Sequence, residues 1–131
     1  MASIPTDLRY TKDHEWARVD PDGNVRIGIT EYAQSHLGDV VMVELPRVDQ
    51  GVEAGKPFGT VESPKSVSDL YAPVSGRVRE VNGELDQSPE LVNKDPYGNG
   101  WVVIIEAKDV RDLDGLLTAE AYEAHLATLE G

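Results

Sequence analysis

Short runs in which every second residue is apolar restrict the fold of this chain more than any other feature of its sequence. In the run VRIGI, the side chains of Val25, Ile27 and Ile29 would lie on one face of an extended chain, which is the period of a half-buried strand. The turn-forming sequence DPDG at residues 20–23 comes directly before, so this run and residues 16–19 are predicted to form a hairpin. The sequence therefore favours a mainly β protein of antiparallel character.

Further strand-like runs follow along the chain, whereas helix signals are few. Strands are predicted at residues 40–44, 58–62, 67–71, 76–81 and 101–106. Thr30 can cap a short helix that ends at Gly38, and the sequence SPE at residues 88–90 has the cap and first-turn residues of a single turn. Near the C-terminus, Asp109 and Thr118 can each cap a segment with apolar residues at helical spacing. These C-terminal segments are expected to pack on the sheet.

The length and composition of the chain fit one globular domain. No linker or break in composition divides the 131 residues, so residues 1–131 are predicted to form a single domain. Apolar residues make up 40% and charged residues 27% of the chain, which describes a soluble protein, and no apolar run is long enough for a membrane span. The N-terminal sequence has neither a secretory nor a transit signal. A cytoplasmic location is therefore expected.

The charge and the missing cysteine exclude several classes of function. The formal net charge is −12, from 24 acidic and 12 basic residues, and such a surface repels the phosphates of nucleic acids. The charge can serve solubility, or it can steer the protein toward basic surfaces of partners. No cysteine is present, so disulfides, thiolate metal sites and cysteine nucleophiles are excluded and any sulfur chemistry must come from an attached or bound group. The three histidines have no metal-ligand spacing.

One lysine stands at a predicted turn between two strands. The sequence SPKS at residues 63–66 favours a turn, so Lys65 is predicted to project from the tip of a hairpin. The runs GDVVMV at residues 38–43 and GRVREV at residues 76–81 are similar and suggest two related halves, with Lys65 in the connection between them. On spacing alone, Lys65 is better interpreted as an ordinary solvated lysine.

The sequence GTVESPKSVSDL at residues 59–70, followed by APVSG at residues 72–76, resembles the lipoyl-attachment motif of the glycine cleavage system H protein family. The resemblance covers nearly the whole chain and includes HEW at residues 14–16, LGDVV at residues 37–41, VELP at residues 43–46 and DPYG at residues 95–98. Two departures are Pro64, where the family usually has a small or β-branched residue, and Asp13, where relatives often have a small polar one. The resemblance implies an antiparallel barrel-sandwich hybrid of the lipoyl/biotinyl hammerhead type, with short connector helices and C-terminal helices.

The function implied by the resemblance is that of a carrier that catalyses no reaction itself. Lipoic acid would be attached to Lys65 as N6-lipoyllysine by a lipoylating enzyme. The arm would carry the aminomethyl group of glycine from a pyridoxal-phosphate glycine decarboxylase to a tetrahydrofolate-dependent aminomethyltransferase. A dihydrolipoyl dehydrogenase would then reoxidise the reduced arm. A monomer is expected, without metal, membrane or nucleic-acid binding.

The resemblance also implies a cleft in which the loaded arm docks. Glu15 and Asp69 fall at positions that line this cleft, and His14 is adjacent. Carboxylates there would pair with the ammonium group of the loaded arm. From the residues alone, Glu15 would instead be a solvated charge on a strand and Asp69 a turn residue.

The sequence leaves several alternative functions open. An H-like protein can also be a relay that hands octanoyl or lipoyl groups to other lipoyl domains. A biotin carrier shares the hairpin-tip lysine, but its motif has methionines beside the lysine, where this chain has Pro64 and Ser66. A lipoyl domain of a 2-oxoacid dehydrogenase would normally stand beside a linker and a catalytic domain. A hydrolytic enzyme that uses Glu15, Asp69 and His14 as acid-base groups is the least favoured hypothesis.

Overall fold

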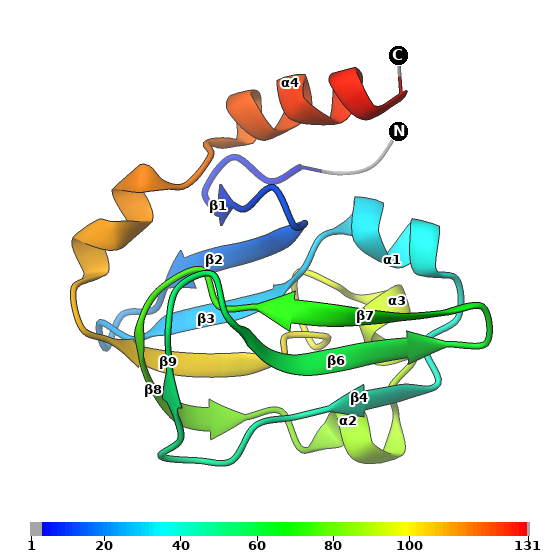
Figure 1. Ribbon diagram of the computed structural model, residues 1–131, viewed down its shortest axis with the longest axis horizontal. Coiled ribbons are helices and arrows are strands. Elements are labelled where there is room, and N and C mark those ends of the chain that lie inside the picture. The colour runs from blue at the N-terminus through cyan, green and yellow to red at the C-terminus, as the bar shows by residue number, and fades with distance from the viewer. Residues whose placement is uncertain (1–3, 131) are drawn as a thin grey trace.

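Two antiparallel sheets form the body of the protein, seen here in a computed structural model that describes residues 4–130 (Figure 1). The six-stranded sheet has the order β1-β2-β3-β9-β8-β5, and the three-stranded sheet has the order β4-β6-β7. The strands are β1 (Arg9–Tyr10), β2 (Glu15–Val19), β3 (Val25–Ile29), β4 (Met42–Glu44), β5 (Gly51–Val52), β6 (Pro57–Ser63), β7 (Ser66–Tyr71), β8 (Gly76–Val81) and β9 (Val103–Ala107). The predicted mainly antiparallel β architecture is confirmed.

The hairpin predicted from the alternating run is present as β2 and β3. The two strands pair from Glu15 opposite Ile29 to Val19 opposite Val25. Gly23 takes a positive φ of 88° in the connecting turn, a conformation that glycine adopts without steric cost. Val25, Ile27 and Ile29 are all buried, as the alternation predicts. Their side chains join the main core, which the two sheets share.

The first of the short connecting helices begins and ends near the predicted residues, whereas the other two do not. Helix α1 (Glu31–Leu37) is capped by Thr30, whose hydroxyl accepts a hydrogen bond from the Ala33 amide at 3.2 Å, and it ends at Gly38 with a φ of 82°. Helix α2 (Glu84–Gln87) was not predicted, and the predicted turn at residues 88–90 leads instead into α3 (Leu91–Lys94). Both helices are single turns that connect β8 to β9.

The C-terminal segments differ from each other. Residues Val110–Gly115 form a 3-10 helix, η1, which Asp109 caps through the Arg111 amide. Helix α4 (Ala119–Glu130) begins after Thr118, whose hydroxyl accepts from the Ala121 amide at 3.2 Å. Both predicted caps are therefore confirmed, while the first segment has the tighter 3-10 winding. This winding is common in short connectors.

Helix α4 is held against the sheet by an aromatic cluster rather than by a leucine face. The rings of Tyr10 on β1 and Tyr122 on α4 stack with their centroids 4.7 Å apart, and Trp16 is fully buried beside them. Leu126 of α4 joins this second core, whereas Leu129 is half exposed. The expectation that the apolar face of this helix packs on the sheet is confirmed for Tyr122 and Leu126 and wrong for Leu129.

Several strand boundaries differ from the prediction. Strand β4 begins at Met42 instead of residue 40, and β9 begins at Val103 instead of residue 101. Strands β1 and β5 were not predicted. Each has only two residues, too few for an alternating pattern to be recognised.

Candidate functional site

Lys65 lies at the tip of the hairpin made by β6 and β7. The strands pair as far as Ser63 opposite Ser66, so Pro64 and Lys65 form the two-residue turn, and the Lys65 side chain is exposed. The predicted hairpin tip is confirmed. The turn lies at the right in Figure 1, at the opposite end of the molecule from the β2–β3 turn.

The Lys65 side chain passes close to the end of α1. Its Cε atom lies 3.8 Å from the position that a Cβ on Gly38 would take. Gly38 has a positive φ of 82°, which other residues rarely adopt. Gly38, the residue at which α1 ends, therefore lies next to the side chain of Lys65.

A cleft with a volume of about 340 Å³ lies between the hairpin, α1 and the turn that precedes β2. Its apolar lining comes from both sheets and from α1, and includes Ile29, Leu37, Val61 and Leu70. All four of these side chains are buried members of the main core. The floor of the cleft is therefore apolar, and Ser66, which follows Lys65 directly, lies at its edge.

Two carboxylates line the exposed rim of this cleft. Asp69 comes from β7 and Asp13 from the turn before β2, and both residues are exposed. Asp69 thus lines a cleft, as the resemblance implied. The sequence marks Asp13 only as a departure from the family pattern, and no local signal indicates that it lines the same cleft as Asp69.

Two side chains of α1 also line the cleft and were not predicted to do so. Tyr32 and His36 are stacked, with ring centroids 4.1 Å apart. They are four residues apart on a helix, so they lie on the same face. The four-residue spacing of Tyr32 and His36, together with the helix cap at Thr30, is the sequence signal from which their place at the site could have been predicted.

Glu15 lies beneath the cleft and is not among the residues that line it. Only 1% of its surface is exposed. Its carboxylate accepts a hydrogen bond from the Thr11 hydroxyl at 2.6 Å and another from the Tyr71 amide at 3.0 Å. Burial raises the pKa of the Glu15 carboxyl to about 7, although both hydrogen bonds act to lower it. Its predicted contact with the docked arm stays a prediction.

His14 lines the cleft and is bonded to the C-terminal helix. Its backbone has a positive φ of 71°, which is uncommon for a residue other than glycine. Its Nδ1 atom lies 2.8 Å from the hydroxyl of Tyr122, on α4. Burial lowers the pKa of the His14 imidazole below its ordinary value, and the nearby His125 lowers it further. The structure therefore brings His14 and Asp69 to one cleft, with Glu15 below it.

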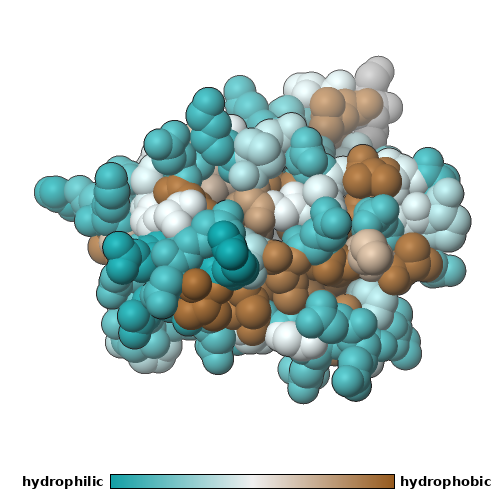
Figure 2. Space-filling view, turned by 60° about the horizontal axis from the view of Figure 1, so that its bottom comes forward, coloured by the Kyte–Doolittle hydropathy of each residue, from teal (hydrophilic) through white to brown (hydrophobic). Residues whose placement is uncertain are grey.

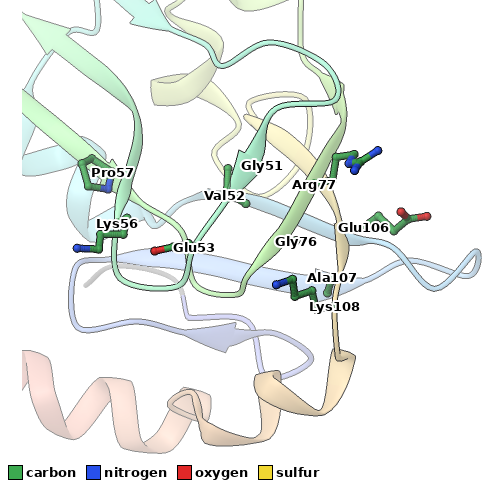
Figure 3. Close-up of a pocket in the computed structure, with 10 residues that line it drawn as sticks. All are labelled: Gly51, Val52, Glu53, Lys56, Pro57, Gly76, Arg77, Glu106, Ala107 and Lys108. Carbon is green, nitrogen blue, oxygen red and sulfur yellow. The ribbon is translucent and has the colours of Figure 1, made fainter.

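A larger hollow, of about 840 Å³, lies at the other end of the β6–β7 hairpin, where β6 begins (Figure 3). Lys56, Arg77 and Lys108 line it together with Glu53 and Glu106. In Figure 3, the charged end of Lys56 points to one side of the hollow, while those of Arg77 and Glu106 point to the other. Because the charged groups of Lys56, Arg77 and Glu106 point apart, these three side chains do not converge on one charged ligand.

Two further features are absent from residues 4–130. No group of three or more His, Cys, Asp or Glu side chains in this part of the chain is arranged to hold a metal ion. Nor does any helix there have the length and the apolar character needed to cross a membrane.

Comparison with known proteins gives matches over nearly the whole chain. Residues 8–129 match the model of the family described as "Glycine cleavage H-protein". The glycine cleavage system H protein of Geobacillus kaustophilus is 58% identical over 122 residues, which cover 93% of this chain and 95% of the relative. The protein of the same name from Mycobacterium tuberculosis strain H37Rv is 56% identical over 132 residues, covering 96% and 98%.

A solved structure matches the fold as well. The crystal structure of a glycine cleavage system H protein from Mycobacterium marinum superimposes with a TM-score of 0.87 at 45% sequence identity. The match covers 95% of this chain and 99% of that one. The expected barrel-sandwich hybrid fold is thereby confirmed.

Proposed function

The chain belongs to the glycine cleavage H-protein family, and on this premise we propose that its lipoyl group is attached to Lys65. As a member of this family, the protein is the lipoyl carrier of the glycine cleavage system. The names of its relatives do not favour the alternative of an octanoyl or lipoyl relay. The observation that carries the proposal is that Lys65 is exposed on a two-residue turn directly beside a cleft with an apolar floor.

The residues around Lys65 fit such a group. When bound, lipoate supplies a ring disulfide that can be reduced to two thiols, a chemistry that the chain itself lacks because it contains no cysteine. The apolar side chains of Ile29, Leu37, Val61 and Leu70 can bind the hydrocarbon part of such an arm and keep water away from it. The cleft starts at Ser66, within reach of the neighbouring lysine side chain.

The charged groups of the cleft suit a cation. Asp13 and Asp69 carry carboxylates at its rim, where they can accept hydrogen bonds from a protonated amine. Glu15 supports this arrangement from below, since its bond to the Tyr71 amide fixes the end of the strand that carries Asp69. In this proposal Asp69 and His14 contact the docked arm, while Glu15 acts on it by positioning β7.

We further propose that the protein has no catalytic site of its own and presents the tip of the hairpin to its partners. These would be the pyridoxal-phosphate decarboxylase, the aminomethyltransferase, the dihydrolipoyl dehydrogenase and the lipoylating enzyme. Three apolar side chains near the tip support such contacts, because Val41, Met42 and Val67 are each at least half exposed. The strand register places Met42 and Val67 on either side of Glu62, and the Val41 amide bonds to the Glu62 carbonyl.

We refer to these three side chains, Val41, Met42 and Val67, as the tip patch. Figure 2 shows hydrophobic side chains gathered in a band across the face that is turned forward from the bottom of Figure 1. Exposed apolar patches that are rimmed by polar residues are typical of surfaces that bind other proteins. The single domain over residues 1–131, the monomeric state and the cytoplasmic location stay predictions.

Reconstitution with the partner enzymes tests this function. The lipoylated protein should support release of carbon dioxide and ammonia from glycine when it is combined with the decarboxylase, the aminomethyltransferase and tetrahydrofolate, which accepts the methylene group. A relay without a role in glycine cleavage would accept the lipoyl group but fail in this assay. The unlipoylated protein serves as the control and should be inactive, whereas hydrolytic turnover without lipoate would support the enzyme hypothesis.

A further inference from the structure

A chain of hydrogen bonds joins two walls of the cleft through the C-terminal helix. The Tyr122 hydroxyl lies 2.8 Å from Nδ1 of His14 and 2.8 Å from Oγ1 of Thr30. Thr30 Oγ1 in turn accepts a hydrogen bond from the Ala33 amide, as the cap of α1. His14 belongs to one wall of the cleft and α1 forms another, so a single phenol oxygen on α4 connects both.

The burial of Thr30 determines which group is the donor in each of these hydrogen bonds. Thr30 has 0% of its surface exposed, so its hydroxyl hydrogen cannot be donated to bulk water. Its oxygen already accepts from the Ala33 amide, and among the described residues the Tyr122 oxygen is the one acceptor in reach of its hydrogen. Thr30 therefore donates to Tyr122. The Tyr122 hydrogen is then free to be donated to Nδ1 of His14.

The opposite direction would leave a buried group unsatisfied. If Nδ1 of His14 carried the proton, it would donate to the Tyr122 oxygen, and Tyr122 would donate to Thr30. The Thr30 hydroxyl would then accept twice and have no acceptor for its own hydrogen within residues 4–130. A buried donor without a partner is costly, and no buried side-chain nitrogen or oxygen in the described chain lacks a partner.

We infer that His14 is a neutral imidazole with its proton on Nε2, and that Tyr122 is the positioning residue that fixes this tautomer. The backbone around His14 supports the assignment, since its amide donates to the Thr11 carbonyl at 3.1 Å and its carbonyl accepts from the Thr30 amide at 3.0 Å. These bonds hold the main chain in its positive-φ conformation while Tyr122 holds the ring.

The groups that surround His14 agree with a neutral ring. Burial and the nearby rings of His125 on α4 and His36 on α1 lower the pKa of His14, whereas Asp13 acts in the opposite direction. Tyr32 of α1 also contacts the imidazole, with the ring centroids 4.8 Å apart. Two further acidic groups nearby are Glu15, next in the chain, and Asp69, which lines the same cleft.

The tautomer of His14 affects how the cleft holds a cation, an effect that rests on the proposed function. A neutral imidazole does not repel a cation held by Asp13 and Asp69, whereas a protonated one would. Protonation at Nδ1 would also remove the acceptor of the Tyr122 hydroxyl. Acidification should therefore weaken the retention of a cation in the cleft and loosen the contact between α4 and the turn at His14.

The ring nitrogens of His14 can be observed directly in the full-length protein with a free Lys65. The ¹⁵N chemical shifts of its imidazole, identified by their loss in His14→Gln, should show a single tautomer with an unprotonated Nδ1. Tyr122→Phe keeps the stacked ring but removes the donor, so the excess of the Nε2–H tautomer should fall toward the modest excess of a free imidazole, and the pKa of His14 should rise. Thr30→Ser keeps the hydroxyl and should preserve the tautomer of His14. Thr30→Val removes the hydroxyl and should weaken the preference for that tautomer.

Tyr10→Phe is the matched control. It removes a hydroxyl from the ring that stacks on Tyr122, and this hydroxyl bonds to the Pro5 carbonyl rather than to His14. The His14 signals should be unchanged in this variant. A proton on Nδ1 in the wild type, or an unchanged tautomer and pKa in Tyr122→Phe, would overturn the inference. Either result would leave lipoyl attachment at Lys65 untouched, because the measurement uses the unmodified protein.

Discussion

The Glu15 carboxylate and the Tyr71 amide are 56 residues apart in sequence and are joined by a hydrogen bond of 3.0 Å. This bond connects β2 of the larger sheet with the last residue of β7, the strand that carries Asp69 and begins beside Lys65. The Thr11 hydroxyl binds the other carboxylate oxygen. A buried acid is therefore part of the connection between the two sheets below the cleft.

The first prediction concerns the pH dependence of this connection. The pKa of Glu15 is raised from an ordinary 4.5 to about 7 in the folded protein, so the folded state binds this proton more tightly than the unfolded state. The contribution of Glu15 to the free energy of unfolding should therefore fall as the pH rises from about 4.5 to about 7. Glu15→Gln, which is neutral throughout, should be stabilised relative to wild type at pH 8 by up to about 3 kcal/mol more than at pH 5.

Chemical denaturation at the two pH values measures this difference. Glu53→Gln changes an exposed glutamate and should show a much smaller pH-dependent difference from wild type. If Glu15→Gln differs from wild type by the same amount at both pH values, the buried carboxyl does not titrate as described.

The second prediction concerns the tip patch. Val67→Ser and Met42→Ser remove apolar surface beside Lys65, so each should weaken binding of the decarboxylase or the aminomethyltransferase by about 1 kcal/mol, or roughly fivefold in Kd. Val19→Ser is the matched control, because Val19 is 46% exposed and is the last residue of β2, and the β2–β3 turn lies at the opposite end of the molecule from the hairpin tip (Figure 1). Binding measured by calorimetry should be unaffected in the control. Equal losses in all three variants would contradict a specific role of the tip patch.

The third prediction concerns the net charge of −12. If acidic side chains steer the protein toward basic surfaces of its partners, added salt should lower the association rate constant more than it changes the dissociation rate constant. Stopped-flow binding over a series of salt concentrations measures both. An association rate that does not depend on salt would mean that the charge serves solubility alone.

The fourth prediction concerns the two rim carboxylates. Asp69→Asn and Asp13→Asn should each speed the spontaneous loss of the aminomethyl group from the lipoyl arm by roughly fivefold. The effect is modest because both side chains are exposed. Lipoylation and melting temperature should not change. Asp86→Asn, an exposed aspartate that does not line the cleft, is the control. Loss rates equal to wild type in both rim variants would show that the cleft shelters the arm by shape alone.

Local sequence patterns were sufficient for most of the fold. The alternation at Val25, Ile27 and Ile29, the caps at Thr30 and Thr118, and the hairpin tip at Lys65 were all predictable. Each depends on residues that are close in the chain, for which strand period, cap chemistry and turn preference are informative. The resemblance added the expectation that Lys65 is an attachment site, whereas spacing alone favoured an ordinary surface lysine.

The arrangement of the cleft depends on contacts between distant segments and could not be read from the same patterns. Glu15 fits an alternating strand that would expose its side chain, yet Thr11 and Tyr71 bind it in the interior. His14 and Tyr122 are 108 residues apart, and neither residue has a local signal for its partner. Tertiary packing decided the role of these side chains, as it did for the two-residue strands β1 and β5.

The attachment of lipoate to Lys65 is the central claim, and mass spectrometry of the protein after incubation with a lipoylating enzyme tests it most directly. Intact mass should increase by one lipoyl group, and peptide mapping should place this group on the peptide that contains Lys65. Lys65→Arg should fold with an unchanged melting temperature, because the side chain is exposed, and should gain no mass, since a guanidinium does not form the amide. A lipoyl group on another lysine, or a mass increase in Lys65→Arg, would contradict the assignment.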